Sequence, residues 1–525
     1  MNKIKLSILS VVLFGATLLH AQESNTLYFL ENSPMRHYIN PAFEPLSKMY
    51  LSLPVIGYTT ATVGNNSLTM SNLVYQKDGK TMTFLHPDGY GMDEFLRHIR
   101  PQMSVNIDTR INLLSFGFSI KDRGYFHLNI NERVVGDAGI PKGLMEFALG
   151  GGMQDINGGV NSYDLKQLQA RVSAYTEFAF GYSHQFNQHW GFGMTLKFLY
   201  GTAYANMTQN DLRLDASADE WALRGNGYMQ IAAPLKSYPA SIAIEDLKTG
   251  FELPSLNGYA DIMELIKPNG LGGAIDLGIT YKPIKMLQIS AAVTDLGFIR
   301  WNKGQQYNYD VNGVYDGVGE FDYGEYVDET GQFDSNRLMD TVTTRLTDVY
   351  STALQQTDIK KGFNNMLSPT LNVGVDANFW GNRVGVGVYS RTKFVGGSAL
   401  EELIFGAAFR PFHWLQLAAS YSLFNGKSGN IGAALGIVTY EGIGLTLTAD
   451  YIPLYYAHYD KIPLPYKTST VNIGLGLNIV IGHNRDKDKD GVRDAFDLCP
   501  DTPRGMKVND KGCPIDEQHH VEKRK

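Results

Sequence analysis

The sequence of 525 residues is poor in cysteine and in charge, and it has no long hydrophobic run beyond its N-terminus. Its two cysteines both lie in the last 27 residues, so disulfides cannot hold the bulk of the chain together. Charged residues make up 19%, against about 25% in an average soluble protein. A net charge of −7 without a basic patch excludes a nucleic-acid-binding protein, because phosphate binding requires a dense cationic surface. No later apolar run reaches the roughly 18 residues of a transmembrane helix.

The N-terminus has the three regions of a secretory signal peptide. Lys3 and Lys5 precede an apolar run from Leu6 to Leu19, and the small residue Ala21 precedes Gln22. A membrane-anchoring helix is the alternative, but this run is shorter than the roughly 20 residues that span a bilayer. We therefore expect residues 1–21 to be removed on export.

Period-two alternation dominates the exported chain. From Met103 to Ile111 every second residue is apolar or β-branched, which is typical of a strand with one apolar and one polar face. The same pattern recurs in about a dozen stretches, among them 126–131, 177–183, 192–200, 275–281, 287–293, 371–379, 415–423, 431–437, 443–451 and 471–481. The chain is therefore expected to be all-β.

Two architectures contain many amphipathic strands, a soluble sandwich and a transmembrane barrel. A sandwich turns its polar face to water and carries Lys and Glu there, whereas this polar face is mostly Gly, Asn, Ser and Thr, which suit a crowded lumen. The stretches are about 9 to 11 residues long, as tilted membrane strands are, and aromatic residues gather near their ends. These features favour an antiparallel transmembrane β-barrel.

Connection lengths support the barrel. Tight turns at 187–188, 282–284, 381–382, 410–413 and 441–442 alternate with long connections at 136–173, 233–271, 302–367 and 453–469. In outer-membrane barrels the short turns are periplasmic, which places the C-terminal tail in the periplasm. We expect about 14 strands, with 12 to 16 allowed, in a barrel over residues 49–482. Residues 22–48 would be a periplasmic or plug segment.

One segment has the spacing of a calcium loop. Asp486, Asp488, Asp490, Asp494 and Asp497 take positions 1, 3, 5, 9 and 12 of an EF-hand-like loop, with Gly491 at the turn and the Val492 carbonyl at position 7. Carboxylate and carbonyl oxygens are the ligands that calcium prefers. A charged, solvated linker is the alternative.

The residues that follow the loop include Cys499-Pro500-Asp501, Gly505, Val508 and Gly512-Cys513-Pro514. Together with the loop they resemble a thrombospondin type-3 repeat over residues 483–516, before a charged tail at 517–525. Such repeats bind calcium and are often stapled by a disulfide, so the resemblance implies a bond between Cys499 and Cys513 in an oxidising compartment.

A second resemblance lies near the start of the mature chain. Asn40-Pro41-Ala42-Phe43, followed by Leu46, Lys48, Tyr50, Leu53-Pro54 and Gly57, resembles the opening of an uncharacterised outer-membrane family of the Bacteroidetes. The Asn-Pro-Ala entry is also similar to that of long-chain fatty-acid-transporter-like barrels. Neither resemblance supplies a substrate.

These patterns predict an outer-membrane channel or transporter for small or hydrophobic solutes. Its lumen would be lined by residues of the polar face, among them Asn106, Asp108, Arg110, Asn372 and Asp376. The alternative is a structural, assembly or adhesion protein that binds a periplasmic or cell-surface protein partner. Lipid of the outer membrane is the other expected partner. We expect no enzyme, because the sequence has no catalytic motif such as Gly-x-Ser-x-Gly or His-Glu-x-x-His.

Overall fold

The computed structural model describes most of residues 24–515. The larger undescribed stretches are 1–23, 84–91, 151–159, 242–266, 317–353 and 516–525, and shorter gaps of up to four residues lie elsewhere, several of them between 484 and 510. The expected signal peptide, the cleavage site and the charged tail at 517–525 therefore lie outside the described residues.

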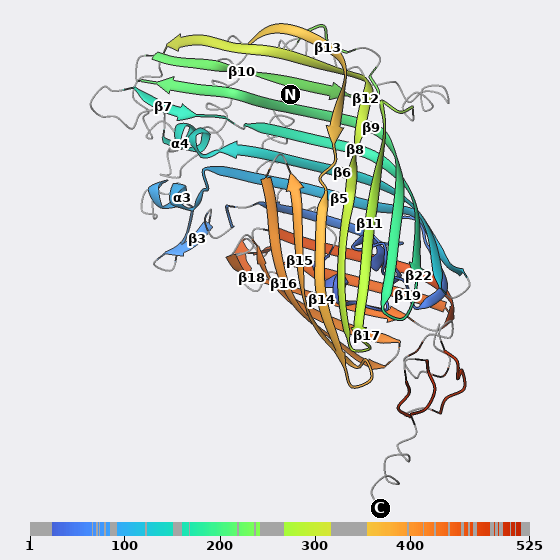
Figure 1. The fold of residues 1–525 in the computed structure, drawn as a ribbon. Helices are drawn as coiled ribbons and strands as arrows, with labels where there is room; N and C mark the ends of the chain where they lie inside the picture. The colour runs from blue at the N-terminus through green and yellow to red at the C-terminus, as the bar shows by residue number, and fades with distance from the viewer. Residues whose placement is uncertain are drawn as a thin grey trace, which may run out of the picture.

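Eighteen strand segments form one sheet that closes on itself (Figure 1). Four positions of the ring hold two consecutive segments each, which lie end to end and pair with a common neighbouring strand. These are β1 with β2, β7 with β8, β10 with β11 and β13 with β14, so the ring has 14 positions. The prediction of an all-β antiparallel barrel of about 14 strands is confirmed. The segments are β1 (Ser47–Ser52), β2 (Thr59–Asn65), β5 (Gln102–Ile120), β6 (Gly124–Pro141), β7 (Asn161–Asp164), β8 (Gln169–Gln185), β9 (Trp190–Ala216), β10 (Glu220–Ala232), β11 (Gly270–Ile284), β12 (Leu287–Asp316), β13 (Leu354–Met366), β14 (Thr370–Phe379), β15 (Val384–Val395), β16 (Ser398–Phe412), β17 (Leu415–Phe424), β18 (Lys427–Val438), β19 (Gly442–Asp450) and β22 (Thr470–His483).

Each ring position pairs antiparallel with the next along the chain, and β22 closes the ring against β1 and β2. Two small hairpins, β3 (Val74–Lys77) with β4 (Lys80–Thr83) and β20 (Tyr456–Tyr459) with β21 (Ile462–Pro465), stand outside the ring. The helical pieces are η2 (Asn25–Phe29), η3 (Pro34–Tyr38), α3 (Met92–His98) and α4 (Lys142–Gly150). None of the helices in the described part of the chain has the length and apolar character needed to cross a membrane.

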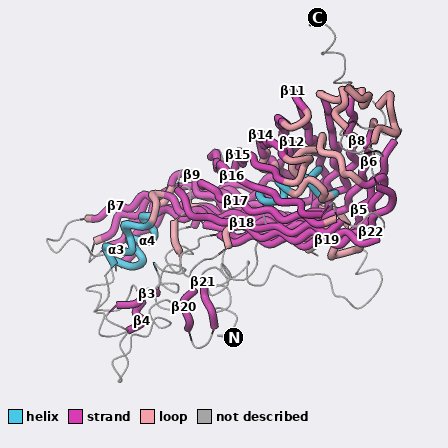
Figure 2. Tube along the Cα trace, turned by 90° about the horizontal axis from the view of Figure 1, so that it is seen from below, coloured by secondary structure: helices cyan, strands magenta, loops and turns pink. Residues whose placement is uncertain are grey.

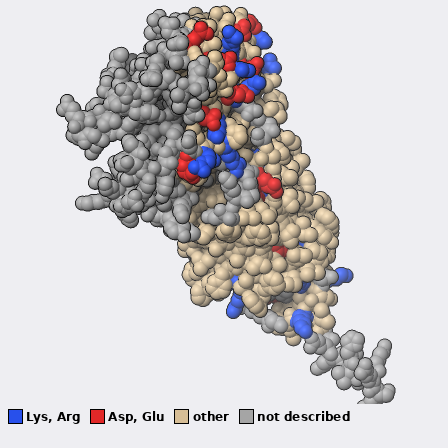
Figure 3. Space-filling view, turned by 90° about the vertical axis from the view of Figure 1, so that its left-hand side faces the viewer, with Lys and Arg blue, Asp and Glu red and all other residues tan. Residues whose placement is uncertain are grey.

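The outer face of the barrel is apolar. Along β14, Leu371, Val373 and Val375 are about 40% exposed, whereas Asn372 between them is 6% exposed. The same alternation runs along β8, β9, β11, β17 and β22. On the face that Figure 3 shows, acidic and basic side chains gather at one end, several Lys and Arg side chains lie at the other end, and the wall between them is almost free of charge. This band is the surface that a bilayer requires of a barrel.

Several strands are much longer than expected. β9 has 27 residues and β12 has 30, and with β10 and β13 they continue the sheet beyond the ring at the end that carries the long connections (Figure 1). This end is called the long-loop end, and the opposite end the short-turn end. The expected connections at 136–173 and 302–367 are therefore partly strand. In β9 the register shifts at Thr202, between the pairs Tyr175–Gly201 and Ala174–Ala203, and again between Gln209 and Asp211. Beyond these shifts Leu212 and Leu214 are buried in one apolar cluster with Phe147 of α4.

Candidate functional site

The lumen is occupied by the start of the described chain. Residues 24–43, named here the lumen segment, are almost all buried and carry the helical turns η2 and η3 within the ring of strands (Figure 2). Pro34 starts η3, and the Ser33 hydroxyl accepts a hydrogen bond from the Met35 amide, which caps the turn. The apolar side chains of the segment pack on wall residues such as Tyr50, Tyr389 and Ile404.

Polar contacts hold the lumen segment at both ends of the barrel. At the long-loop end, the Ser24 hydroxyl donates to Asp450 at 2.6 Å and the Asn25 amide donates to Glu402 at 2.7 Å. At the short-turn end, Glu31 accepts from Asn382 at 2.9 Å and lies 3.2 Å from the Arg410 guanidinium. The segment therefore spans much of the lumen between two polar anchors.

Glu31, the anchor at the short-turn end, stays ionised at ordinary pH. Burial raises the pKa of Glu31, but the positive charges of Arg410, Lys282 and Arg36 prevail and lower this pKa to about 2. A depressed carboxyl pKa adds stability that is complete above the ordinary pKa of 4.5 and is lost as the pH falls toward 2. We expect the anchor to be insensitive to pH between about 5 and 8.

Glycines on the wall make room for the segment. A Cβ atom at Gly193 of β9 would overlap the backbone of Pro41, and one at Gly278 of β11 would overlap the Asn40 side chain. These two glycines face each other across the strand pair. The Asn40 amide in turn donates to the carbonyl oxygens of Ile279 and Ala291, at 3.3 Å each. The Asn40-Pro41 motif is thus a docking contact between the segment and a glycine-lined wall.

Four of the five predicted lumen residues lie in this interior. Asn372 donates to the Ile39 carbonyl at 3.0 Å, Asp376 accepts from the Tyr28 hydroxyl at 3.0 Å, and the Arg110 guanidinium lies 4.3 Å from the Tyr38 ring centre. Asp108 is buried in the ion pairs described next. Asn106 is half-buried near the long-loop end, paired with Gly64 and Asp137.

An ion-pair chain crosses the lumen beside the segment. Asp108 of β5 lies 2.8 Å from Lys393 of β15 and 3.1 Å from Arg133 of β6. Because β5 and β15 stand seven positions apart in the ring of 14, the first pair joins opposite walls. Arg133 continues to Asp295 at 3.8 Å, and Lys197 pairs with Asp295 and Asp276 at 2.6 and 2.8 Å.

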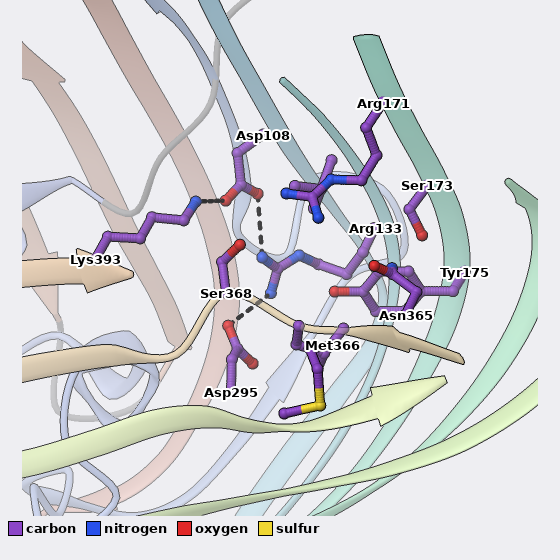
Figure 4. A pocket seen from close by; sticks show the side chains of 12 residues that line it. Asp108, Arg133, Arg171, Ser173, Tyr175, Asp295, Asn365, Met366, Ser368 and Lys393 are labelled. Carbon is purple, nitrogen blue, oxygen red and sulfur yellow. Dashed lines mark hydrogen bonds and ion pairs between the residues drawn. The ribbon is translucent and has the colours of Figure 1, made fainter. Parts of the chain in front are cut away.

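A partly open cavity adjoins this chain (Figure 4). About 420 Å³ of space lies between its walls, and this space includes open solvent at the mouth. Arg133, Ser173 and Tyr175 line one side, Lys393 and Asp108 another, and the linker between β13 and β14 a third. Sequence reasoning did not single out Arg133, Lys197, Asp295 or Lys393. The sequence did carry a signal for these residues, because each is a charged residue within an alternating, largely apolar stretch. In a soluble protein the same side chain would face the solvent.

The expected calcium loop is only partly within the described residues. Asp486, Asp490 and Asp494 lie outside them. Asp488 accepts from the Thr502 amide at 2.8 Å, Asp497 accepts from the Cys499 amide at 2.7 Å, and Val492 is buried. The described residues contain no group of three or more metal-ligating side chains. The disulfide that the resemblance implied is present between Cys499 and Cys513.

Comparison with solved structures finds distant similarity to transport proteins. The P. putida toluene transporter TodX is 10% identical, with 86% of this chain and 95% of that chain covered and a TM-score of 0.38. A Pseudomonas aeruginosa FadL homologue is 10% identical, with 88% and 98% covered and a TM-score of 0.35. Comparison with curated protein sequences found no match.

A sequence family gives a more direct assignment. A family of unknown function, DUF5723, matches residues 41–450, which begin inside the Asn40–Phe43 motif and end at the last residue of β19. The match covers more than three quarters of the chain. The protein is therefore a member of the DUF5723 family.

Proposed function

We propose that the protein is a gated outer-membrane channel or transporter for small or hydrophobic solutes, and that the lumen segment is its plug. One observation carries this proposal: a closed barrel with an apolar exterior holds a separate segment in its lumen through exchangeable side-chain contacts. Within the described residues the chain connects the segment to the wall at β1, so the segment can leave the lumen without breaking the ring of strands. Movement of the segment would open a path.

The plug can be tested by locking it to the wall. The Ser33 hydroxyl lies 3.0 Å from the Thr446 hydroxyl, and the described part of the chain has no free cysteine to interfere. We expect Ser33→Cys with Thr446→Cys to abolish solute uptake into liposomes that contain the full chain, and a reductant to restore it. Wild-type protein with reductant controls for the native Cys499–Cys513 bond. Uptake that is unchanged by the lock contradicts the plug.

The alternative of a surface protein has one observation in its favour. The sheet extension at the long-loop end has its own apolar core, formed by α4, β7, β9, β10 and β12 around Trp221 and Tyr307. A rigid platform of this kind suits the presentation of a binding surface. The lock distinguishes the two functions, because a protein that only presents a surface is indifferent to the position of the plug.

We also propose that residues 486–497 bind calcium, with Asp486, Asp488, Asp490, Val492, Asp494 and Asp497 as ligands, and that the tail lies in the periplasm. Support comes from the spacing and from Asp497, whose second carboxylate oxygen is buried and makes no hydrogen bond within the described residues. Carboxylates gathered in one loop repel each other until a cation binds, so binding should order the loop.

Removal of calcium tests this site on the full chain. We expect about 1 mM calcium to protect residues 486–513 from limited proteolysis, with an affinity near the 10⁻⁴ to 10⁻³ M of extracellular modules. Chelator or Asp490→Ala should remove the protection, while Asp501→Ala, outside the loop, should retain it. The heat-dependent gel shift of the barrel should not change. Cleavage that is equal with and without calcium would leave the segment a charged linker.

A further inference from the structure

The cavity beside the ion-pair chain holds hydrogen-bond donors without acceptors. Arg133 is 5% exposed and Ser173 is 4% exposed, and both line the cavity (Figure 4). Nε and Nη1 of Arg133 and the hydroxyl of Ser173 make no hydrogen bond within the described residues. Arg133 Nη1 has only long ion pairs, of 3.8 Å to Asp295 and 4.0 Å to Glu177. Buried polar groups of this kind normally have partners, so the cavity lacks an acceptor.

The charges around the cavity favour an anion as that acceptor. Three cationic side chains line it, Arg133, Arg171 and Lys393, against the two carboxylates of Asp108 and Asp295. Arg171 is held in place from outside the cavity by Asp137, at 2.6 Å. The guanidinium groups can only donate hydrogen bonds, and an ionised acceptor forms the stronger ones. A cation would instead face two guanidinium groups and an ammonium group.

Apolar groups border the same space. Val135, Met366 and Leu367 also line it, next to the polar residues Asn365 and Ser368, and Leu367 belongs to the apolar cluster around Trp301 and Phe363. A ligand in this cavity would therefore place a charged oxygen group against Arg133 and Ser173 and a short apolar body against the linker between β13 and β14.

We propose that this cavity binds the carboxylate group of a small organic acid. The carboxylate oxygens would accept from Ser173 and Arg133 and would approach Lys393. This site needs no movement of the plug, so its existence does not depend on the proposed channel function.

The regulation that follows does rest on the proposed function. Lys393 and Arg133 are the two cations that bind Asp108, and the pair of Lys393 with Asp108 joins opposite walls of the lumen. A bound carboxylate competes with Asp108 for both cations. Its binding would weaken the contact across the lumen and so favour an open path.

Fluorine NMR on the full chain in detergent tests the site directly. We expect 4,4,4-trifluorobutyrate to show line broadening that saturates, whereas 4,4,4-trifluorobutanol and 4,4,4-trifluorobutylammonium, which have the same apolar body, should show only the broadening caused by micelles. Ser173→Val replaces the hydroxyl with a methyl group that fills the cavity. It should weaken binding of the carboxylate at least tenfold.

Ser422→Val is the matched control, because Ser422 is an equally buried serine on β17, away from the cavity. It should bind the probe as the wild type does. Lys393→Gln is a second variant, which removes one cation and should also weaken binding. The heat-dependent gel shift verifies that each variant is folded. Equal broadening by all three probes, or binding that both Ser173→Val and Lys393→Gln retain, would mean that the cavity holds only water and would overturn the proposal.

The experiments test binding of the carboxylate and opening of the barrel independently. The NMR measurement does not require transport. Bilayer conductance that rises with trifluorobutyrate, but not with trifluorobutanol, and only in protein with Ser173, supports the regulation. Binding without any such rise would retain the carboxylate site and reject its link to opening.

Discussion

Gly193→Ala should open the barrel. The added methyl group would overlap the backbone carbonyl of Pro41, and neither the strand nor the short loop around Pro41 can move aside cheaply. Overpacking of a well-packed contact costs about 1 to 3 kcal/mol, which shifts the docking equilibrium of the plug about 5- to 150-fold toward release. Single-channel conductance in planar bilayers should therefore show longer open times than the wild type, approaching those of a deletion of residues 24–43.

Gly436→Ala is the control for this result. Gly436 on β18 also faces the plug, but a Cβ atom there would meet the nearest atom, a methyl carbon of Leu30, at an ordinary 3.6 Å. Alanine also suits a strand at least as well as glycine, so neither variant should harm the barrel itself. Equal conductance of the two variants would show that the docking of Asn40-Pro41 does not keep the lumen closed.

The wall of the barrel could be predicted from the sequence because its information is local. Alternation of period two identified which residues face outward, and in β5 a bulge between Asn112 and Leu114 shifts this alternation by one residue. The abundance of glycine on the polar face indicated a crowded lumen. It did not indicate what occupies the lumen, because a segment that contacts strands on all sides of the barrel has no repeating pattern of apolar residues.

The ion-pair chain and the long strands required the structure. Asp108 and Lys393 are 285 residues apart, and only closure of the ring brings their strands to opposite walls of one lumen. The upper half of β12 was interpreted as part of the connection at 302–367 because its polar and apolar positions exchange faces beyond the membrane band. There the inner face packs on α4 rather than facing a polar lumen, so the rule that identified the barrel no longer holds.

Val375→Arg should be the most damaging single change on the outer face. Val375 lies in the middle of β14 and is 41% exposed, and its cross-strand neighbours Ile289 and Val388 are exposed to the same degree. A guanidinium group at this depth would displace lipid contacts on three adjacent strands. The cost is about 2 to 4 kcal/mol at the bilayer midplane.

Phe379→Arg is the control on the same strand and the same face. Phe379 ends β14 at the short-turn end, where an arginine can reach the lipid headgroups, and the expected cost there is only about 0 to 1 kcal/mol. Urea unfolding of each variant in liposomes measures the two costs. A soluble sandwich would tolerate arginine equally at both positions, since water would cover its outer face along the whole strand. A clear difference between Val375→Arg and Phe379→Arg therefore reports the depth of a bilayer around β14 and not the strand itself.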